Sequence, residues 1–408
     1  MRIGISTWTR RRAGGVETYL ADLVPALVDL GHQVAILHEV DEPADRAPIV
    51  GDSGVPQWCA GGDPAARERA LAALRAWNPD VIFAQGLEDP LLETRVAAIA
   101  PAVLFAHAYR GTCISGTKSR AALGHSACDR QLGWPCLVRY YPHRCGGLNP
   151  ITMARLYKRE SMRRDGLNQY AAVVAFSSHI EREYVKHGVD RSRTFRLPGH
   201  VPASPAPPPA RARKAAAPSR LVFVGRMEPP KGGDVLLEAL PAVSRMLGRP
   251  LHLSFVGDGR CRSAWQARAE ASFPAGGSTR VEFTGWLAAD ARDRRLDDSD
   301  LLVVPSLWPE PFGLIGLEAA ARGVPAAAFD VGGISEWLHD DVNGYLARGT
   351  ASAETLAAAI VKCLADPVVH ARLSRGALRV AASHSMAAHL TALLGVFTGV
   401  QVRLQEPA

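Results

Sequence analysis

The sequence contains no long apolar run. Met1 leads directly into Arg2 to Ser6, which reads as a buried strand, and the apolar stretch of a signal peptide is missing. No run approaches the roughly 18 to 20 apolar residues that a membrane-spanning helix needs. We therefore expect a cytoplasmic protein.

Cysteine is scarce and has no regular spacing. The chain of 408 residues has seven cysteines, an odd number, and no C-x-x-C pair, so neither a disulfide framework nor an ordinary zinc pattern is predicted. Four of the cysteines gather in one segment, with two histidines nearby: Cys113, Cys128, Cys136, Cys145, His125 and His143. Two interpretations stay open for this group, a structural metal site and free thiols that are buried or reactive.

Acidic residues are rare in that same segment. The net charge of the chain is +7, and residues 110–165 hold eleven Lys and Arg against Asp129, Glu160 and Asp165. This excess indicates either attraction to an anionic lipid surface or phosphate-bearing acceptor, or an ordinary solvated basic face. Nucleic acid is not an expected partner, because no nucleic-acid-binding motif accompanies the charge.

The composition is that of a globular protein with two large domains. Hydrophobic residues make up 47% and charged residues 21% of the chain. The first half alternates short apolar runs with amphipathic segments, which predicts a parallel sheet with crossover helices. The expected strands are Ile3–Ser6, Val34–Leu37, Val81–Ala84, Val103–Ala106 and Ala172–Phe176. The clearest helix runs from about Val16 to Leu30, with Pro25 inside it and Gly31 as its stop.

A segment rich in Pro, Ala and Arg separates this half from a second series of strands. It spans about residues 199–219 and reads as a linker. Strands are then expected at Leu221–Val224, Leu251–Val256, Val281–Thr284, Leu301–Val304 and Pro325–Phe329. A last helix is expected over about Ala377–Phe397. The pattern predicts an α/β fold of two doubly wound halves.

The stretch from Pro305 to Glu318 is the most specific motif. In open parallel sheets, ligands bind beyond the carboxyl ends of the strands. The strand Leu301–Val304 leads into Ser-Leu-Trp-Pro-Glu-Pro-Phe-Gly and then into a helix. Free backbone N–H groups at Gly313, Leu314 and Ile315 would favour a phosphate or a sugar oxygen.

Two glutamates in this stretch suggest a glycosidase pair as an alternative. The carboxylates of a glycosidase lie about 5 to 9.5 Å apart. If their segment were helical throughout, Glu310 and Glu318 would lie about 12 Å apart along the axis. They fit better as two contacts on one long ligand.

The motif resembles the signature of the retaining GT-B glycosyltransferases of glycosyltransferase family four, also called glycosyl transferases group 1. The resemblance implies that Glu310 lies against the donor sugar and that Glu318 holds the ribose of the nucleotide. A second motif agrees, since Gly225-Arg226 and Lys231-Gly232 are similar to the family's cationic pair that stabilises the departing diphosphate without a metal ion.

Two further positions match the family on the N-terminal side. Gly14 and Gly15 resemble its glycine pair facing the donor diphosphate; the full G-x-G-x-x-G spacing of an NAD site is missing, and a plain structural turn is the alternative. His107 follows a strand and resembles a histidine that contacts the donor sugar and assists catalysis, although a lone histidine also fits a structural role. Trp286 resembles a family position that often contacts the base, although a packing role fits equally well. The turn Gly257-Asp258-Gly259 resembles a family turn near the nucleotide and is assigned no contact.

The resemblance implies two Rossmann-like domains facing a cleft, with a C-terminal helix that crosses back to the first domain. The predicted divisions are 1–198 for the acceptor side with a Cys-rich basic insertion at 108–165, 199–219 for the linker, 220–380 for the donor side, and 381–408 for the final helix.

The implied activity is a nucleotide-sugar-dependent, retaining glycosyltransferase that needs no cofactor. The donor would be a UDP- or GDP-sugar and the catalytic residues Glu310, His107, Arg226 and Lys231. The basic segment favours a lipid-linked or anionic acceptor, with peripheral contact to the inner face of the membrane, while a soluble small molecule stays open as the alternative. The pathway would be cell-surface polysaccharide, glycolipid or natural-product glycan synthesis. Alternatives are a non-catalytic sugar-nucleotide-binding protein, a phosphorylase-like enzyme and, more distantly, an NAD-dependent oxidoreductase.

Overall fold

The chain folds into two compact units, each made from separate pieces of sequence. The computed structural model describes residues 1–12, 14–42, 46–51, 54–201, 218–274 and 276–405. The first unit comprises Met1–Lys118, Asp129–Pro198 and the segment from Met386 onward. The second comprises Ser119–Cys128 and Gly199–Ser385. Most of the predicted linker, residues 202–217, lies outside the described residues.

A parallel sheet forms the centre of the first unit. Within the described residues it has seven strands in the order β3-β2-β1-β4-β5-β8-β9. Their bounds are β1 (Arg2–Thr9), β2 (Gln33–Val40), β3 (Gln57–Cys59), β4 (Val81–Ala84), β5 (Ala102–Phe105), β8 (Ala172–Ala175) and β9 (Thr194–Arg196). Strand order reverses at the β1–β4 pair, which brings the loops after these strands to one end of the sheet.

Helices connect these strands, and most begin at a polar cap. They are α1 (Gly15–Asp29), α2 (Pro64–Trp77), α3 (Pro90–Ala97), α4 (Pro135–Arg139), α5 (Pro150–Asp165) and α6 (Ser178–Lys186). The side chains of Asp63, Asp89, Asn149 and Ser177 accept hydrogen bonds from the first N–H groups of α2, α3, α5 and α6. Pro25 lies inside α1 as expected, and Gly31 follows it with a φ of +82°.

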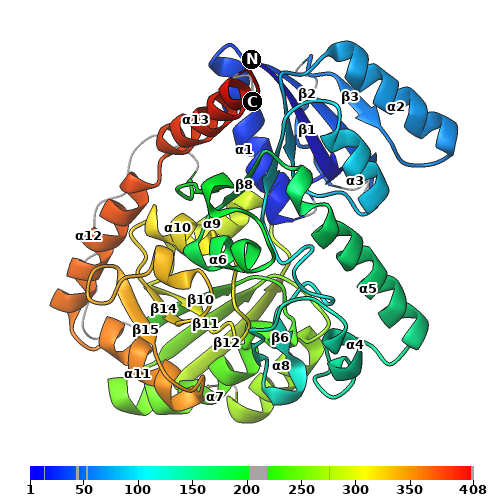
Figure 1. The fold of residues 1–408 in the computed structure, drawn as a ribbon. Coiled ribbons are helices and arrows are strands. Elements are labelled where there is room, and N and C mark those ends of the chain that lie inside the picture. Colours follow the sequence, from blue (N-terminus) through cyan, green and yellow to red (C-terminus); the bar gives the residue numbers. More distant parts are fainter. Residues whose placement is uncertain (13, 43–45, 52–53, 202–217, 275, 406–408) are drawn as a thin grey trace. The chain divides into compact units, whose positions relative to one another are not determined.

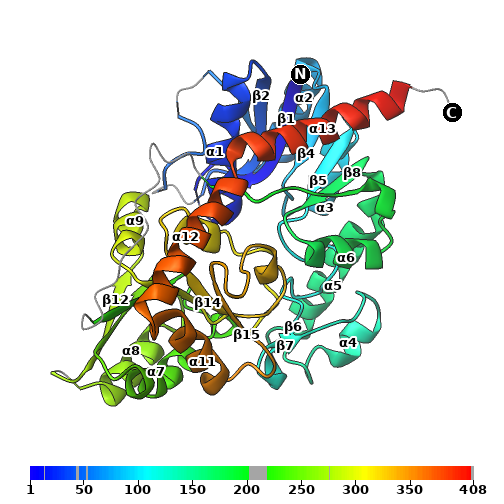
Figure 2. The same ribbon diagram turned by 90° about the vertical axis from the view of Figure 1, so that its left-hand side faces the viewer.

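The C-terminal helix α13 (Met386–Gln405) packs on the first unit, beside α1 and β4 (Figure 2). The Phe397 ring lies 5.2 Å from the Phe83 ring of β4, between centroids. The hydroxyl of Tyr19 on α1 lies 2.9 Å from Nε2 of His389. The prediction of a single helix over Ala377–Phe397 is wrong, because α12 (Pro367–Ser383) ends before Ser385, which forms an isolated β-bridge with Val201.

The second unit has its own parallel sheet, with six strands among the described residues, in the order β12-β11-β10-β13-β14-β15. The bounds are β10 (Ser219–Val224), β11 (Leu251–Val256), β12 (Thr279–Gly285), β13 (Leu301–Val304), β14 (Ala326–Phe329) and β15 (Gly344–Ala347). Its helices are α7 (Gly233–Leu247), α8 (Arg262–Ser272), α9 (Ala289–Asp297), α10 (Ile315–Ala320), α11 (Ala353–Leu364) and α12. In Figure 1, α7 and α11 lie together on one face of this sheet, where Leu236, Phe255, Val303 and Ile360 share one core.

A short antiparallel hairpin, β6 (Ser119–Arg120) and β7 (Ser126–Ala127), groups with the second unit although the sequence places it inside the first half. The prediction of two Rossmann-like parallel sheets with interleaved helices is confirmed.

Candidate functional site

A partly buried ion pair joins two loops at the carboxyl ends of adjacent strands of the second unit. Lys231 follows β10 and Glu310 follows β13, and these strands are neighbours. The Nζ atom of Lys231 lies 2.5 Å from Oε1 of Glu310, whose residue is 6% exposed. Ser306 donates its hydroxyl to the same oxygen over 2.5 Å. The sequence thus brings the two predicted residues into direct contact.

Glu310 keeps its charge in spite of burial. Desolvation alone raises the pKa of this carboxyl, but the Lys231 cation and the hydrogen bonds from Lys231, Ser306 and Trp308 outweigh it and hold the pKa below its usual value. The Lys231 ammonium also lies 5.2 Å from the centroid of the Trp308 ring. The pair is a fixed carboxylate beside a fixed cation.

Gly232 sets the spacing between the two loops. Its φ is +66°, and a Cβ placed on it would lie 1.9 Å from the carbonyl oxygen of Pro305. The N–H of Leu307 donates to the carbonyl of Pro230 over 2.8 Å. Only a residue without a side chain allows the Lys231 loop to approach the Glu310 loop this closely.

Backbone donors follow Glu310 at the start of α10. Gly313 has a φ of +86°, and the N–H groups of Gly313, Leu314 and Ile315 donate no hydrogen bond within the described part of the chain. Such groups can receive a phosphate or a sugar oxygen. The carbonyl of Phe312 is held by the indole N–H of Trp337 over 2.8 Å, which fixes this turn.

The other two donor-side residues lie apart from the ion pair. The carboxylate of Glu318, on α10, lies 3.0 Å from the guanidinium of Arg292 on α9. Arg292 was not predicted from the sequence, because it lies on a different helix from Glu318. Arg226 follows β10; this residue is exposed, and its side chain forms no hydrogen bond or ion pair within the described chain. A free guanidinium of this kind is available to an anionic ligand.

In the first unit, Gly14 and Gly15 begin α1 at the carboxyl end of β1. Gly14 is the N-cap residue, with extended φ and ψ of −162°, and Gly15 is the first helical residue. A Cβ on Gly15 would meet no atom within 4 Å, so the space above it is open. The structure therefore leaves room for a ligand at this helix start.

His107 lies in a pocket of the first unit, lined also by Thr7, Gln85, Gly86, Arg110 and Tyr184. Its Nε2 atom lies 2.6 Å from Oε1 of Gln85. Burial, with the nearby charges of Arg110 and His389, lowers the pKa of His107 to about 3, so the imidazole is neutral at physiological pH. Gln85 was not predicted, although it follows β4 as His107 follows β5.

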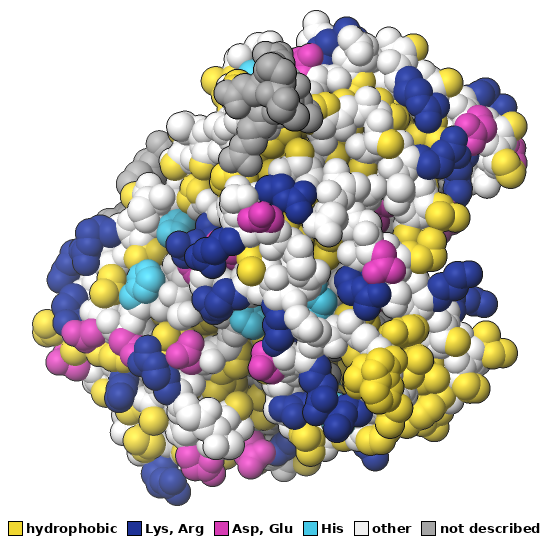
Figure 3. Space-filling model, viewed as in Figure 1, with side chains coloured by type: hydrophobic (Ala, Val, Ile, Leu, Met, Phe, Trp, Pro, Cys, Tyr) yellow, Lys and Arg dark blue, Asp and Glu magenta, His cyan; other side chains and the backbone are white. Residues whose placement is uncertain are grey.

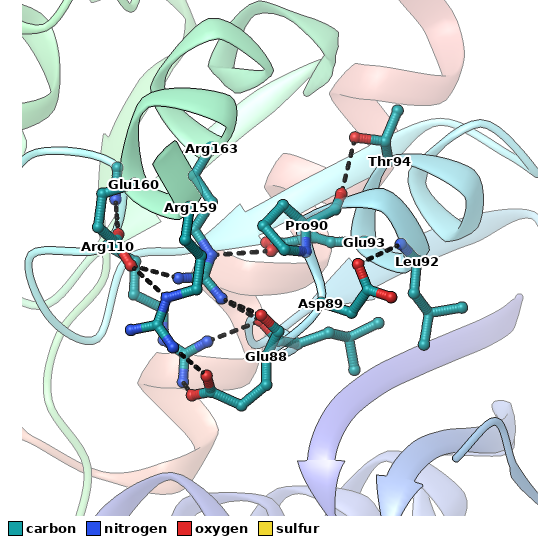
Figure 4. Close-up of polar contacts among 12 residues, drawn as sticks. Glu88, Asp89, Pro90, Leu92, Glu93, Thr94, Arg110, Arg159, Glu160 and Arg163 are labelled. Carbon is teal, nitrogen blue, oxygen red and sulfur yellow. Dashed lines mark hydrogen bonds and ion pairs between the residues drawn. The ribbon is translucent and has the colours of Figure 1, made fainter. Parts of the chain in front are cut away.

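An Arg and Glu network holds one wall of this pocket (Figure 4). Arg163 on α5 donates to the carbonyls of Leu87 and Glu88, over 2.6 and 2.9 Å, and pairs with the carboxylates of Glu93 and Glu160. Glu160 accepts the N–H of Gly111 over 2.8 Å. The loops after β4 and β5 are thereby tied to α5, with buried charges that are each partnered.

The four clustered cysteines do not converge. All seven cysteines of the chain are free, and the described residues contain no group of three or more His, Cys, Asp or Glu placed to hold a metal. Cys113 is buried, whereas Cys128, Cys136 and Cys145 are half-buried.

None of the described helices is long and apolar enough to span a membrane.

The two sheets, each with loops gathered at the carboxyl ends of its strands, define the GT-B class of glycosyltransferase folds. Residues 13–204 match the family model Glycosyltransferase Family 4, and residues 218–366 match the model Glycosyl transferases group 1. Together the models cover most of the chain. It belongs to the glycosyltransferases of these families.

Named relatives are also glycosyltransferases. The D-inositol 3-phosphate glycosyltransferase of Nocardia farcinica is 35% identical over 45% of this chain and 42% of its own, so that alignment spans less than half of the relative. A GDP-mannose-dependent alpha-(1-6)-phosphatidylinositol monomannoside mannosyltransferase of Mycobacterium tuberculosis is 27% identical over 87% of this chain and 86% of its own.

Among solved structures, the fold is similar to that of Anabaena HepE in complex with UDP. The TM-score is 0.67 at 18% identity, over 99% of this chain and 100% of the other. Sucrose-phosphate synthase from Thermosynechococcus elongatus gives 0.68 at 18% identity, over 99% and 100%. At these identities the likeness concerns the fold.

Proposed function

We propose that the protein is a retaining glycosyltransferase that moves a sugar from a UDP- or GDP-sugar to an acceptor hydroxyl. The partly buried pair of Lys231 and Glu310 carries this proposal, because it places a cation and a carboxylate side by side at the carboxyl end of the second sheet. A cation there can bind the diphosphate, while the carboxylate accepts hydrogen bonds from sugar hydroxyls.

The donor contacts divide along the nucleotide sugar. Arg226, Lys231 and the N–H groups of Gly313 to Ile315 hold the diphosphate, Glu310 faces the sugar, and Glu318 reaches the ribose. Gly14 and Gly15 supply an open helix start for phosphate oxygens. No cofactor is required, because the two cations stabilise the charge that develops on the leaving group.

The proposed transfer is balanced without a dedicated protein base. The bond between the anomeric carbon and the phosphate oxygen breaks, and its electron pair leaves with the diphosphate. The acceptor oxygen forms its bond on the same face of the sugar, and its proton passes to the departing phosphate oxygen. His107, neutral and held by Gln85, then acts as a hydrogen-bond partner of a substrate hydroxyl.

The proposed acceptor is lipid-linked or otherwise anionic, and the proposed place of work is the cytoplasmic face of a membrane. The basic segment over residues 110–165 supports a lipid-linked or anionic acceptor. The mycobacterial relative supports it as well, because it is named a phosphatidylinositol monomannoside mannosyltransferase. The product would then belong to a glycolipid or cell-surface polysaccharide rather than to a soluble natural product.

A two-stage experiment tests the function. Thermal shift with UDP, GDP and ADP, and then with their sugars, identifies the donor, and NMR of the glycoside formed reports whether its anomeric configuration is that of the donor. An inverted product would contradict retention. Binding without turnover of any donor would favour the non-catalytic alternative, and phosphate-dependent cleavage of a glycoside would favour the phosphorylase-like one.

A further inference from the structure

Exposed apolar side chains are concentrated in one short part of the first unit. Of the fourteen large hydrophobic residues that are exposed in the described chain, five lie within residues 134–151. They are Trp134, Val138, Tyr141, Leu148 and Ile151, with exposed fractions of 70, 66, 36, 84 and 69%. We call these five residues the insertion surface. Figure 3 shows a continuous hydrophobic area over α4 and the start of α5.

The insertion surface stands on a packed base. Tyr140, the residue that follows α4, is fully buried and packs with Ile114 and Leu132. Cys136 and Leu137 pack against the same cluster. Asn149 caps α5 by accepting the N–H groups of Ile151 and Thr152. Because this segment already has its own hydrophobic cluster, the five exposed side chains are not needed for its core, and they face solvent.

The charges in the sequence segment that carries the insertion surface are all of one sign. Between Arg130 and Lys158 the sequence has no Asp or Glu. Five cations in this span are exposed, and their side chains form no hydrogen bond or ion pair within the described residues: Arg130, Arg139, Arg144, Arg155 and Lys158. The next arginines along α5 differ, because Arg159, Arg163 and Arg164 each pair with a carboxylate.

We propose that the insertion surface docks on an anionic lipid membrane. Trp and Tyr suit the headgroup layer, Leu and Ile the acyl boundary, and Arg and Lys the lipid phosphates. A second copy fits poorly, because a twofold contact would place the same cations against one another. The inference deepens the proposed function, since a lipid-linked acceptor would be reached from this surface.

Vesicle binding by the full-length chain tests the proposal. Sedimentation with vesicles of phosphatidylcholine, and of phosphatidylcholine with about 30% phosphatidylglycerol, should show binding to the anionic vesicles that weakens with salt. Trp134→Ser with Leu148→Ser should reduce the partition coefficient at least about tenfold. Arg144→Glu with Arg155→Glu should do the same and flatten the salt dependence.

Matched variants elsewhere serve as controls. Leu30→Ser with Met246→Ser changes two side chains that are each 57% exposed, and Arg69→Glu with Arg245→Glu makes the same charge change at exposed positions. Both should bind vesicles as the parent does. Equal binding to neutral and anionic vesicles, or no loss in the insertion-surface variants, would overturn the proposal.

Two further measurements separate this inference from the proposed activity. Self-association abolished by Trp134→Ser with Leu148→Ser, without vesicle binding, would overturn the proposal in favour of a second copy. Thermal shift with UDP and GDP should be unchanged in all four double variants. If the parent protein binds nucleotide but not vesicles, the membrane surface is refuted and the donor site is not. If it binds vesicles but not nucleotide, the donor site is refuted and the membrane surface is not.

Discussion

The amide oxygen of Gln85 lies 2.6 Å from Nε2 of His107, while the amide nitrogen of Gln85 has no hydrogen-bond partner within the described residues. An acceptor at that distance keeps the proton on Nε2 and leaves Nδ1 as an acceptor. The amide N–H groups of Gln85 are thus donors without an acceptor in the described chain. Gln85 therefore positions His107 and offers donors of its own.

The low pKa of His107 predicts acid sensitivity. The folded pKa, about 3, lies below the usual value of 6.5, so the stability from a neutral imidazole is complete above pH 6.5 and declines as the pH falls toward 3. Between pH 7 and 5 the free energy of unfolding should fall by about 2 kcal/mol more in the parent than in His107→Gln. Urea titrations at both pH values measure this; identical pH dependence in the two proteins would refute it.

Removing one member of the Lys231 and Glu310 pair should cost stability. Lys231→Met leaves a buried carboxylate without its cation and should destabilise the second unit by about 3 kcal/mol. The double variant Lys231→Met with Glu310→Gln removes both charges and should regain most of that stability. Its transfer rate should stay at least about a hundredfold below the parent's. A double variant that recovers activity together with stability would show that the pair is only structural.

Gly232 and Gly248, the two cap residues of α7, both have a left-handed backbone conformation and can be compared directly. Their φ values are +66° and +61°, but only the added Cβ of Gly232 meets another atom within 4 Å. Gly248→Ala should therefore cost about 1 kcal/mol, and Gly232→Ala clearly more, with loss of transfer. Denaturation midpoints and transfer rates check both. Equal effects would mean that the approach to Pro305 is relaxed easily.

Arg226 should affect binding without affecting stability. Arg226 is exposed, and its side chain forms no hydrogen bond or ion pair in the described chain, so Arg226→Ala should leave the unfolding midpoint unchanged. Calorimetric affinity for the nucleoside diphosphate should fall at least about tenfold. Arg245→Ala, exposed on α7, is the control and should bind as the parent does. Equal affinity in both variants would remove Arg226 from the site.

The sequence predicted the centre of both sheets because their strands are continuous apolar runs, such as Val81–Ala84 and Leu301–Val304. It missed β3, β9 and β15, which are three or four residues long and lack such a run. A short strand that lacks an apolar run is recognised only through its pairing with a neighbouring strand. The break between α12 and α13 was missed likewise, because it depends on the bridge to Val201.

The site was predictable where chemistry follows a strand and unpredictable where it depends on distant packing. Lys231 and Glu310 could be named from their motifs, but their contact joins residues far apart in the chain. The ion pair of Arg292 with Glu318 could not be predicted from the sequence, because it depends on how α9 packs beside α10. The exposure of Trp134 and Leu148 had no signal in the sequence, since buried Tyr140 and Leu132 lie between and beside them with the same apolar character.

The division of the chain into discontinuous units has a consequence for its biosynthesis. The first unit is completed by the segment from Met386, whereas the second needs nothing beyond Ser385. On the ribosome, the later-encoded unit can close its sheet while the earlier one still waits for α13. The first unit must therefore remain incomplete, with the ring of Phe83 not yet covered by Phe397, until α13 has emerged.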